Sequence, residues 1–510
     1  MDYDVVIAGA GPVGLMLACE LRLGGARVLV VEREAGTPRS RFGSMGARAL
    51  NSPSVHALHL RGLLPAVERA AAMWLGAGAG LPEFEPGETG ERPDVFVGHF
   101  AGIGIRADRL RPPGPGEEFL GAGVIAQADL EAIFARRAAE LDVEVRRGVA
   151  VTAFESDEDG VNVHIGQETV RTGWLVGADG GRSTVRRLAG FDFPGVDPVF
   201  TGRQAVVDLD DPGKLVADGW QGSENGAYVV GGWADGDGPP RVHTVEYTPP
   251  PDRDAPVTAE EIQDSLRRVS GTDVSVTRVH VATRYADTTR QATTYRRGRV
   301  LLCGDTAHVH SPAGGQGLNL GLGDAVNLGW KLALVTRGAA PDALLDTYTA
   351  ERHPIGAWVQ RWSLAQTALS AGRGPRADAL REVMADLLDT PDGATYVVSK
   401  VGGAWQHYDL PGDFPLIGHR VPDLPLDDGT TLAPRFRAGR AVLLDTGTGA
   451  AEVAAAWGDR IELVTASPLA FPDQKLAALV RPDGHMAWAA VGGEVPGLHE
   501  ALTTWLGPPA

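Results

Sequence analysis

The residues best suited to chemistry form a short strand that ends in an acid and continues into glycines. Residues 300–303 predict a buried strand, and Gly304-Asp305 ends it. An aspartate directly after a parallel strand lies at the carboxyl edge of the sheet, where open α/β folds bind ligands, and it can accept hydrogen bonds from sugar hydroxyls. Five glycines from Gly314 to Gly323 then allow the backbone to approach a flat ring closely. The alternative is an ordinary glycine-rich turn between a strand and a helix.

A second unit of strand, turn and helix begins at residue 4. Residues 5–8 predict a buried strand, and residues 15–23 show helical apolar spacing. The turn between them contains Gly9, Gly11, Pro12 and Gly14. Glycines at this spacing permit a tight turn, close approach of a pyrophosphate and packing of helix on strand, while the helix N-terminus offers free N–H groups. Residues 28–31 predict the next strand, and Glu32 ends it where a carboxylate reaches a ribose hydroxyl.

A third stretch repeats the pattern of a strand followed by an acid. Residues 174–178 predict a buried strand, Asp179-Gly180 ends it, and Ser183 is a candidate helix cap. Taken alone, this stretch reads equally well as a structural junction. The three stretches together predict one nucleotide site at the edge of a single sheet.

These stretches resemble the class A flavoprotein monooxygenases, the family of FAD-dependent aromatic hydroxylases. The resemblance extends to about Arg352 and includes residues 324–331 and 348–354. Within the family, the chain is most similar to actinobacterial enzymes that hydroxylate polyketides or rifamycin-type antibiotics. The resemblance implies an α/β fold: a Rossmann-like FAD-binding domain, an inserted antiparallel β-sheet substrate domain and a C-terminal thioredoxin-like domain.

The implied domains follow the composition of the chain. The FAD-binding domain is expected to be discontinuous, at residues 1–75, 119–195 and 281–400. Residues 76–118 and 196–280, with short β runs and turns, are expected to form the substrate-binding sheet domain. Residues 354–400 show helical spacing, and residues 405–510 form the thioredoxin-like unit, which has no redox cysteines. Four aromatic residues either line the apolar face of the substrate sheet or belong to its core: Phe96, Trp220, Tyr228 and Trp233.

The resemblance also assigns residues to FAD. Glu32 is expected at the adenosine ribose, Asp305 at the ribityl or pyrophosphate region, and Pro312 over the ring. Backbone groups of Gly317, Leu318 and Asn319 are expected at the pyrimidine end of the ring. The full set of expected cofactor-binding residues is Gly9, Gly11, Pro12, Gly14, Glu32, Arg33, Arg41, Arg48, Gln127, Asp179, Gly304, Asp305, Pro312, Gly315, Gly317, Leu318 and Asn319.

Three positions have competing interpretations. The segment from Arg39 to Arg61 departs from the family pattern, so either Arg41 or Arg48 faces the cofactor. Gln127 either lies near the flavin or begins a solvent-facing helix. His308 is interpreted as a local structural hydrogen-bonding group and not as a base.

The composition of the chain limits the classes of binding partner that are expected. Lys and Arg total 47 against 65 Asp and Glu, a net charge of −18, which argues against nucleic acid or an anionic membrane as partner. Cys19 and Cys303 are expected to be core residues, and no metal site is expected. The first strand begins too early for a signal sequence, and no stretch is long enough to span a membrane, so a cytoplasmic enzyme is expected. The C-terminal unit is expected to be structural, with a homodimer surface as one option.

The resemblance implies the chemistry. NADPH would reduce non-covalently bound FAD, O2 would add at flavin C4a, and the distal oxygen would pass to a large hydrophobic substrate. A phenol would be hydroxylated and a ketone would undergo Baeyer-Villiger insertion. No side chain is assigned as catalytic, because the flavin performs the difficult step. The chain has no second glycine fingerprint between a strand and a helix, so NADPH contact is expected to be transient. The alternatives are a non-redox cyclase with structural FAD, an antibiotic-inactivating monooxygenase, and an inactive flavin-binding scaffold.

Overall fold

The computed structural model describes most of the chain. The described residues are 1–75, 96–112, 123–216, 219–231, 239–250, 255–312, 314–472 and 474–509. Trp233 lies outside them, as does the side chain of Phe96, so their expected place in the substrate sheet stays a prediction.

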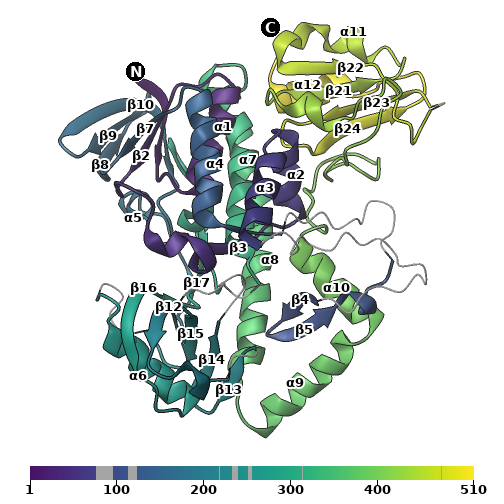
Figure 1. The fold of residues 1–510 in the computed structure, drawn as a ribbon. Coiled ribbons are helices and arrows are strands. Elements are labelled where there is room, and N and C mark those ends of the chain that lie inside the picture. The colour runs from purple at the N-terminus through teal and green to yellow at the C-terminus, as the bar shows by residue number, and fades with distance from the viewer. Residues whose placement is uncertain are drawn as a thin grey trace.

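The largest sheet is built around parallel strands (Figure 1). Its order is β18 (Arg296–Arg297), β19 (Val300–Leu302), β10 (Glu168–Gly177), β1 (Tyr3–Ala8), β2 (Val28–Glu32) and β7 (Glu144–Arg147). β9 (Val161–Ile165) pairs antiparallel with β10, and β8 (Val151–Ser156) pairs antiparallel with β9. The central strands are runs of Val, Ile and Leu because they are buried on both faces.

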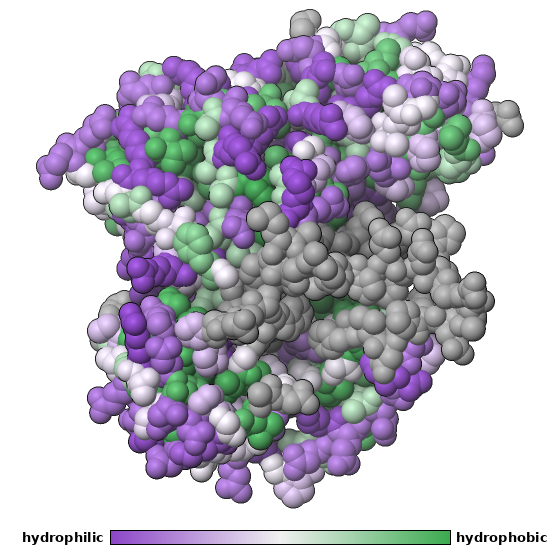
Figure 2. Space-filling model, viewed as in Figure 1, coloured by the Kyte–Doolittle hydropathy of each residue, from purple (hydrophilic) through white to green (hydrophobic). Residues whose placement is uncertain are grey.

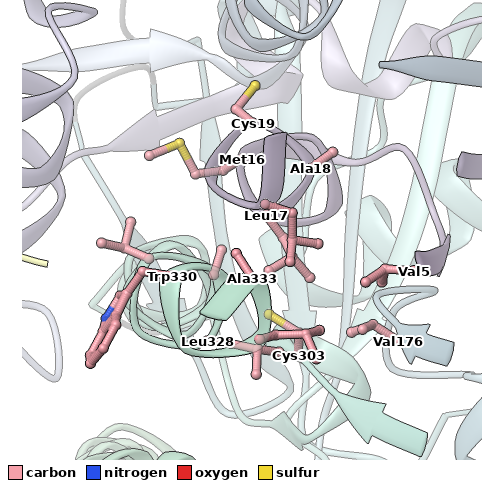
Figure 3. Close-up of a cluster of buried hydrophobic side chains, with 14 of the residues drawn as sticks. Val5, Met16, Leu17, Ala18, Cys19, Val176, Cys303, Leu328, Trp330 and Ala333 are labelled. Atoms are coloured by element: carbon pink, nitrogen blue, oxygen red, sulfur yellow. The ribbon is translucent and has the colours of Figure 1, made fainter. Parts of the chain in front are cut away.

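Two long helices pack side by side against this sheet. These helices are α1 (Pro12–Leu23) and α7 (Gln316–Thr336). Met16 and Leu17 of α1 and Leu328 and Ala333 of α7 belong to the same buried cluster (Figure 3). Glycines allow this close approach, because a Cβ on Gly329 would lie 2.3 Å from the Cβ of Glu20.

Both cysteines lie in this core. Cys19 is 3% exposed, Cys303 is 1% exposed, and neither forms a disulfide, which confirms the expectation that they are core residues (Figure 3).

Shorter elements surround the sheet. The helices are α2 (Ser52–Leu60), α3 (Leu64–Leu75), α4 (Gln127–Glu140) and α5 (Thr184–Leu188). β3 (Ala47–Ala49) pairs with β6 (Val124–Ala126), and β17 (Thr289–Gln291) pairs with both β11 (Gly195–Val196) and β20 (His308–Val309).

A separate antiparallel sheet follows in the chain. Its order is β13 (Gln221–Ser223), β14 (Gly226–Val230), β15 (Arg241–Glu246), β12 (Thr201–Leu209) and β16 (Val276–Ala286). α6 (Ala259–Ser270) packs on one face and shares an apolar core with it. Tyr228 is 6% exposed in this core, whereas Trp220 is 52% exposed. The core interpretation therefore holds for Tyr228.

Three helices follow α7 in the chain: α8 (Asp346–Ala371), α9 (Pro375–Leu388) and α10 (Pro391–Gly402). The helical prediction for residues 354–400 is confirmed, but its start is wrong, because α8 begins at Asp346 and runs through Pro354. The buried contacts of Tyr348 and Glu351 stabilise the turn before the proline, which spacing alone did not reveal. β4 (Phe96–Phe100) and β5 (Ile103–Arg106) pack against this group.

The C-terminal segment forms a mixed sheet. Its order is β22 (Ile461–Val464), β21 (Ala441–Asp445), β23 (Leu476–Val480) and β24 (Met486–Val491), with β21 parallel to β22. α11 (Ala450–Ala454) and α12 (Leu498–Leu506) complete it.

Hydrophilic residues cover most of the outer surface in the view of Figure 2, with smaller hydrophobic patches between them. Within the described part of the chain, no helix combines the length and apolar character needed to span a bilayer.

Candidate cofactor site

The parallel strands bring the three predicted stretches to one edge. Ala8 pairs in register with Val31 on one side and Gly177 on the other, and Gly177 pairs with Leu302. The residues that follow these strands therefore emerge next to one another, although they are separated by up to nearly 300 positions in the chain. The prediction of a single shared sheet edge is confirmed.

The glycines of the first turn have two different roles. Gly9 has φ +111°, and a Cβ there would lie 2.3 Å from the carbonyl oxygen of Ala178. A Cβ on Gly14 would lie 2.0 Å from the carbonyl oxygen of Gly9. A Cβ on Gly11 would meet no atom within 4 Å. Gly9 and Gly14 are thus required for packing, and Gly11 leaves open space at the start of α1, where Pro12 sets the first turn.

Glu32 holds this turn from the neighbouring strand. Its carboxylate accepts a hydrogen bond from the Ala10 amide at 2.8 Å and another from the Glu34 amide at 2.9 Å. Arg33 points outward, where its side chain is 71% exposed and ion-paired with Glu34. A carboxylate has lone pairs beyond two hydrogen bonds, so Glu32 can still accept one from a ribose hydroxyl.

Asp179 has a local structural task. Its carboxylate accepts hydrogen bonds from the Thr184 amide at 2.7 Å and from the hydroxyls of Ser183 and Thr306. Ser183 in turn caps α5 by accepting from the Arg186 amide, as predicted. Contact between Asp179 and the cofactor stays a prediction.

Asp305 is exposed in the turn after β19, and the side chains that hold this turn in place are buried. Gly304 has φ +66°, and its amide donates to Asp324 at 3.1 Å. Asp324 also contacts His308 at 2.6 Å and Arg352 at 2.8 Å. The structural role predicted for His308 is confirmed. Sequence reasoning did not identify Asp324 and Arg352 as supports, because their only signal was membership of the family-like segments.

The start of α7 is fixed by Asn319. Its side-chain oxygen accepts from the Asn51 amide and the Ser54 hydroxyl, and its amide nitrogen donates to the Ala49 and Gly315 carbonyls. The first amides of the helix, including those of Gly317 and Leu318, lack partners within the helix and can bind an acceptor. Gly315, with φ +64°, caps the helix beside open space, and Pro312 is exposed next to it.

The two candidate arginines occupy different environments. Arg41 forms an ion pair with Glu131 at 2.9 Å, and the same oxygen accepts from Gln127 at 2.9 Å. Arg48 donates to the Ala47 carbonyl at 2.8 Å, and burial lowers its pKa against the opposing effects of Asp305 and Glu131. Gln127 and Arg41 are held together by Glu131. Which of the two arginines contacts the cofactor stays a prediction.

Replacing Asp305 by alanine is expected to weaken FAD retention by roughly tenfold, the effect of losing one or two hydrogen bonds to a polar ligand. The ratio of flavin to protein absorbance after gel filtration measures this. Glu34→Ala, which removes an acid from the surface near Glu32, serves as the control. An unchanged flavin content in the Asp305 variant would contradict the role assigned here.

The edge thus combines an open helix start at Gly11, the carboxylate of Glu32 on the neighbouring strand, the exposed acid Asp305 and a second open helix start at Gly315. This combination defines a dinucleotide-binding α/β protein suited to a flavin. Residues 2–363 match the family described as FAD binding domain, and residues 414–509 match the family described as aromatic-ring hydroxylase, C-terminal. The chain belongs to this family, the FAD-dependent monooxygenases of the aromatic-ring hydroxylase type.

Relatives and solved structures match over the whole chain. A 12-dehydrotetracycline 5-monooxygenase/anhydrotetracycline 6-monooxygenase of Streptomyces rimosus is 43% identical, with 100% of both chains covered. A rifampicin monooxygenase of Streptomyces venezuelae is 37% identical, with 99% of both covered. A dialkyldecalin synthase of Streptomyces rugosporus is 36% identical, with 100% of both covered. The solved structure of an anhydrotetracycline hydroxylase from Streptomyces rimosus is 40% identical, has a TM-score of 0.83 and covers 100% of both chains.

Proposed function

We propose that this chain is an NADPH-consuming monooxygenase that inserts one atom of O2 into a large aromatic polyketide or related natural product. The observation that carries the proposal is the similarity, over the full length of both chains, to a monooxygenase of anhydrotetracycline. FAD supplies the redox chemistry, and the protein supplies binding, orientation and exclusion of water. In the balanced reaction, NADPH gives two electrons, one oxygen atom enters the substrate as a hydroxyl or an ester oxygen, and the other leaves as water.

The contacts described above support a specific placement of FAD. The open start of α1 at Gly11 would receive the pyrophosphate, and Glu32 the adenosine ribose. Asp305, exposed after β19, would accept from the ribityl chain. The free amides at the start of α7 would meet the pyrimidine end of the ring.

The separate sheets support the expected assignment of different roles to different parts of the chain. In the proposal, residues 1–75, 119–195 and 281–400 bind FAD, and residues 76–118 and 196–280 cover the substrate. Residues 405–510 form the thioredoxin-like unit, whose mixed sheet supports the flavin-binding part and carries no redox chemistry.

Oxygen-isotope labelling tests the reaction. Purified holoprotein, NADPH, 18O2 and an anhydrotetracycline-type phenol are expected to give a product carrying one 18O atom by mass spectrometry. Omitting NADPH is expected to abolish that product. A product that forms with NADPH but without the label would overturn the monooxygenase proposal for that substrate.

A second candidate is a non-redox cyclisation with FAD as a structural cofactor. The similarity to a dialkyldecalin synthase over the full length of both chains favours keeping it. The same labelling experiment separates the two, because a cyclase would convert its substrate without NADPH and without a gain of oxygen. The similarity to a rifampicin monooxygenase supports a third role, inactivation of an antibiotic by the same oxygenation chemistry.

A further inference from the structure

A small cavity with several polar side chains in its lining lies where the C-terminal segment meets the flavin-binding helices. Its volume is about 30 Å³. α2, α7 and α8 line one side, and the segment before β21 and the turn between β23 and β24 line the other. The polar residues of the lining include Arg352, Tyr408, Arg420, Asp483 and His485.

Arg420 brings a positive charge to this cavity. Its guanidinium donates to the Gly403 carbonyl at 3.0 Å, and among the described residues no carboxylate lies within ion-pairing distance of it. The other two charges of the lining are already neutralised. Arg352 is paired with Asp324 at 2.8 Å, and Asp483 is paired with Arg481 at 2.6 Å. The lining therefore carries one net positive charge.

The histidines that line the cavity do not change its net charge. His56 donates through Nε2 to the Val421 carbonyl at 2.9 Å, and burial lowers its pKa to about 3. Burial also lowers the pKa of His485, against the opposing effect of Asp483. Both rings are neutral near pH 7. Burial lowers the pKa of Arg420 to about 10, so its charge persists at that pH.

The cavity also offers neutral donors. The Tyr408 hydroxyl accepts from Arg352 at 3.4 Å and keeps its own proton to donate. Arg420 is partly buried, and the free energy of a partly buried charge without a counter-ion falls when an opposite charge is placed beside it. The available volume accommodates one small ion or one or two waters, and it is too small for a phosphate ester.

We propose that this cavity binds a monovalent anion of halide size, held by Arg420 and Tyr408. The anion would connect three parts of the chain: α2, α8 and the C-terminal segment. Because Arg352 also holds Asp324, which in turn holds the Gly304 amide, the anion would reinforce the support beneath the cofactor site.

Thermal unfolding of the holoprotein tests the site. The midpoint is measured at constant ionic strength while sodium gluconate is replaced by sodium chloride. We expect a saturable rise of about 2 °C in chloride, because a ligand bound only by the folded state stabilises it. In crystals soaked in sodium bromide, an anomalous peak is expected beside Arg420.

Two variants separate the specific site from a general salt effect. Arg420→Gln is expected to abolish the chloride-dependent rise. Arg435→Gln, an arginine of the same segment that pairs with Asp428 near the surface, is expected to retain it. If Arg420→Gln does not fold, the bromide peak and the chloride titration of the unmodified protein decide. Equal midpoints in both salts and no bromide peak beside Arg420 would mean that the cavity holds water only, and would overturn the proposal.

Discussion

Replacing Arg481 by alanine is expected to lower the free energy of unfolding by about 3–5 kcal/mol, because it leaves buried carboxylates without their partner. Arg481 is fully buried and contacts both oxygens of Glu351 at 2.8 Å. It also contacts Asp483 at 2.6 Å. These contacts connect the C-terminal segment to α8, so the loss affects the interface between the two parts of the chain.

Chemical denaturation monitored by fluorescence and by flavin release measures this loss. Arg435→Ala removes an arginine of the same segment whose ion pair is partly exposed, and little change is expected for it. If both variants were equally stable, the buried network would not be a major source of stability.

The same network predicts sensitivity to acid. Burial raises the pKa of Glu351, but Arg481 and Lys331 outweigh burial and hold it at about 2. A carboxyl whose pKa is lower in the folded state contributes stability above the pKa of the unfolded chain, and this contribution disappears as the pH falls through the folded value. The protein is therefore expected to lose stability between about pH 4.5 and pH 2. In the Arg481 variant, the midpoint of acid unfolding should lie at higher pH, because only Lys331 then remains to keep the pKa of Glu351 low.

Replacing Gly11 by alanine is expected to reduce FAD affinity at least about 100-fold while leaving the folded apoprotein intact. A Cβ there would meet no protein atom within 4 Å, and the residue has φ −72°, which alanine adopts readily. The added methyl group would instead occupy the space through which the pyrophosphate approaches the first amides of α1. Fluorescence titration of apoprotein with FAD measures the affinity, and thermal unfolding without FAD reports on the fold.

Gly14→Ala provides the matched comparison. A Cβ at Gly14 would overlap the Gly9 carbonyl at 2.0 Å, so this variant is expected to unfold at a lower temperature even without FAD. If Gly11→Ala bound FAD normally, the open start of α1 would not be the phosphate site. If Gly11→Ala destabilised the apoprotein as much as Gly14→Ala, the two glycines would not have the separate roles that the geometry gives them.

The parts of the fold that sequence predicted are those with local signals. Strands β1, β2 and β19 are short apolar runs, as is the last part of β10, and a glycine or an acid ends each run or follows it within two residues. The first part of β10 is more polar, so its start at Glu168 was not predicted. Such patterns depend on neighbours within about ten residues, so they are readable without the structure.

The supports of the site could not be predicted in the same way. Asp324, His308 and Arg352 meet through tertiary packing, and Glu351 meets Arg481 across 130 positions in the chain. No local pattern encodes such distant pairing. The choice between Arg41 and Arg48 stays open for the same reason, because no local pattern shows which of the two side chains reaches the cofactor. Sequence also could not show which face of the antiparallel sheet is buried. Only the packing of the sheet against α6 showed that Tyr228 belongs to the core.

The main sheet also has a consequence for the order of events on the ribosome. β1 is made at the outset, yet its sheet is completed by β19, which ends at Leu302. At ~5–20 residues per second, the interval is roughly 15–60 s. Until it has passed, β10 lacks its neighbour β19 and exposes an apolar edge that nascent-chain chaperones can shield. FAD can therefore bind only late in synthesis, when most of the polypeptide has already emerged.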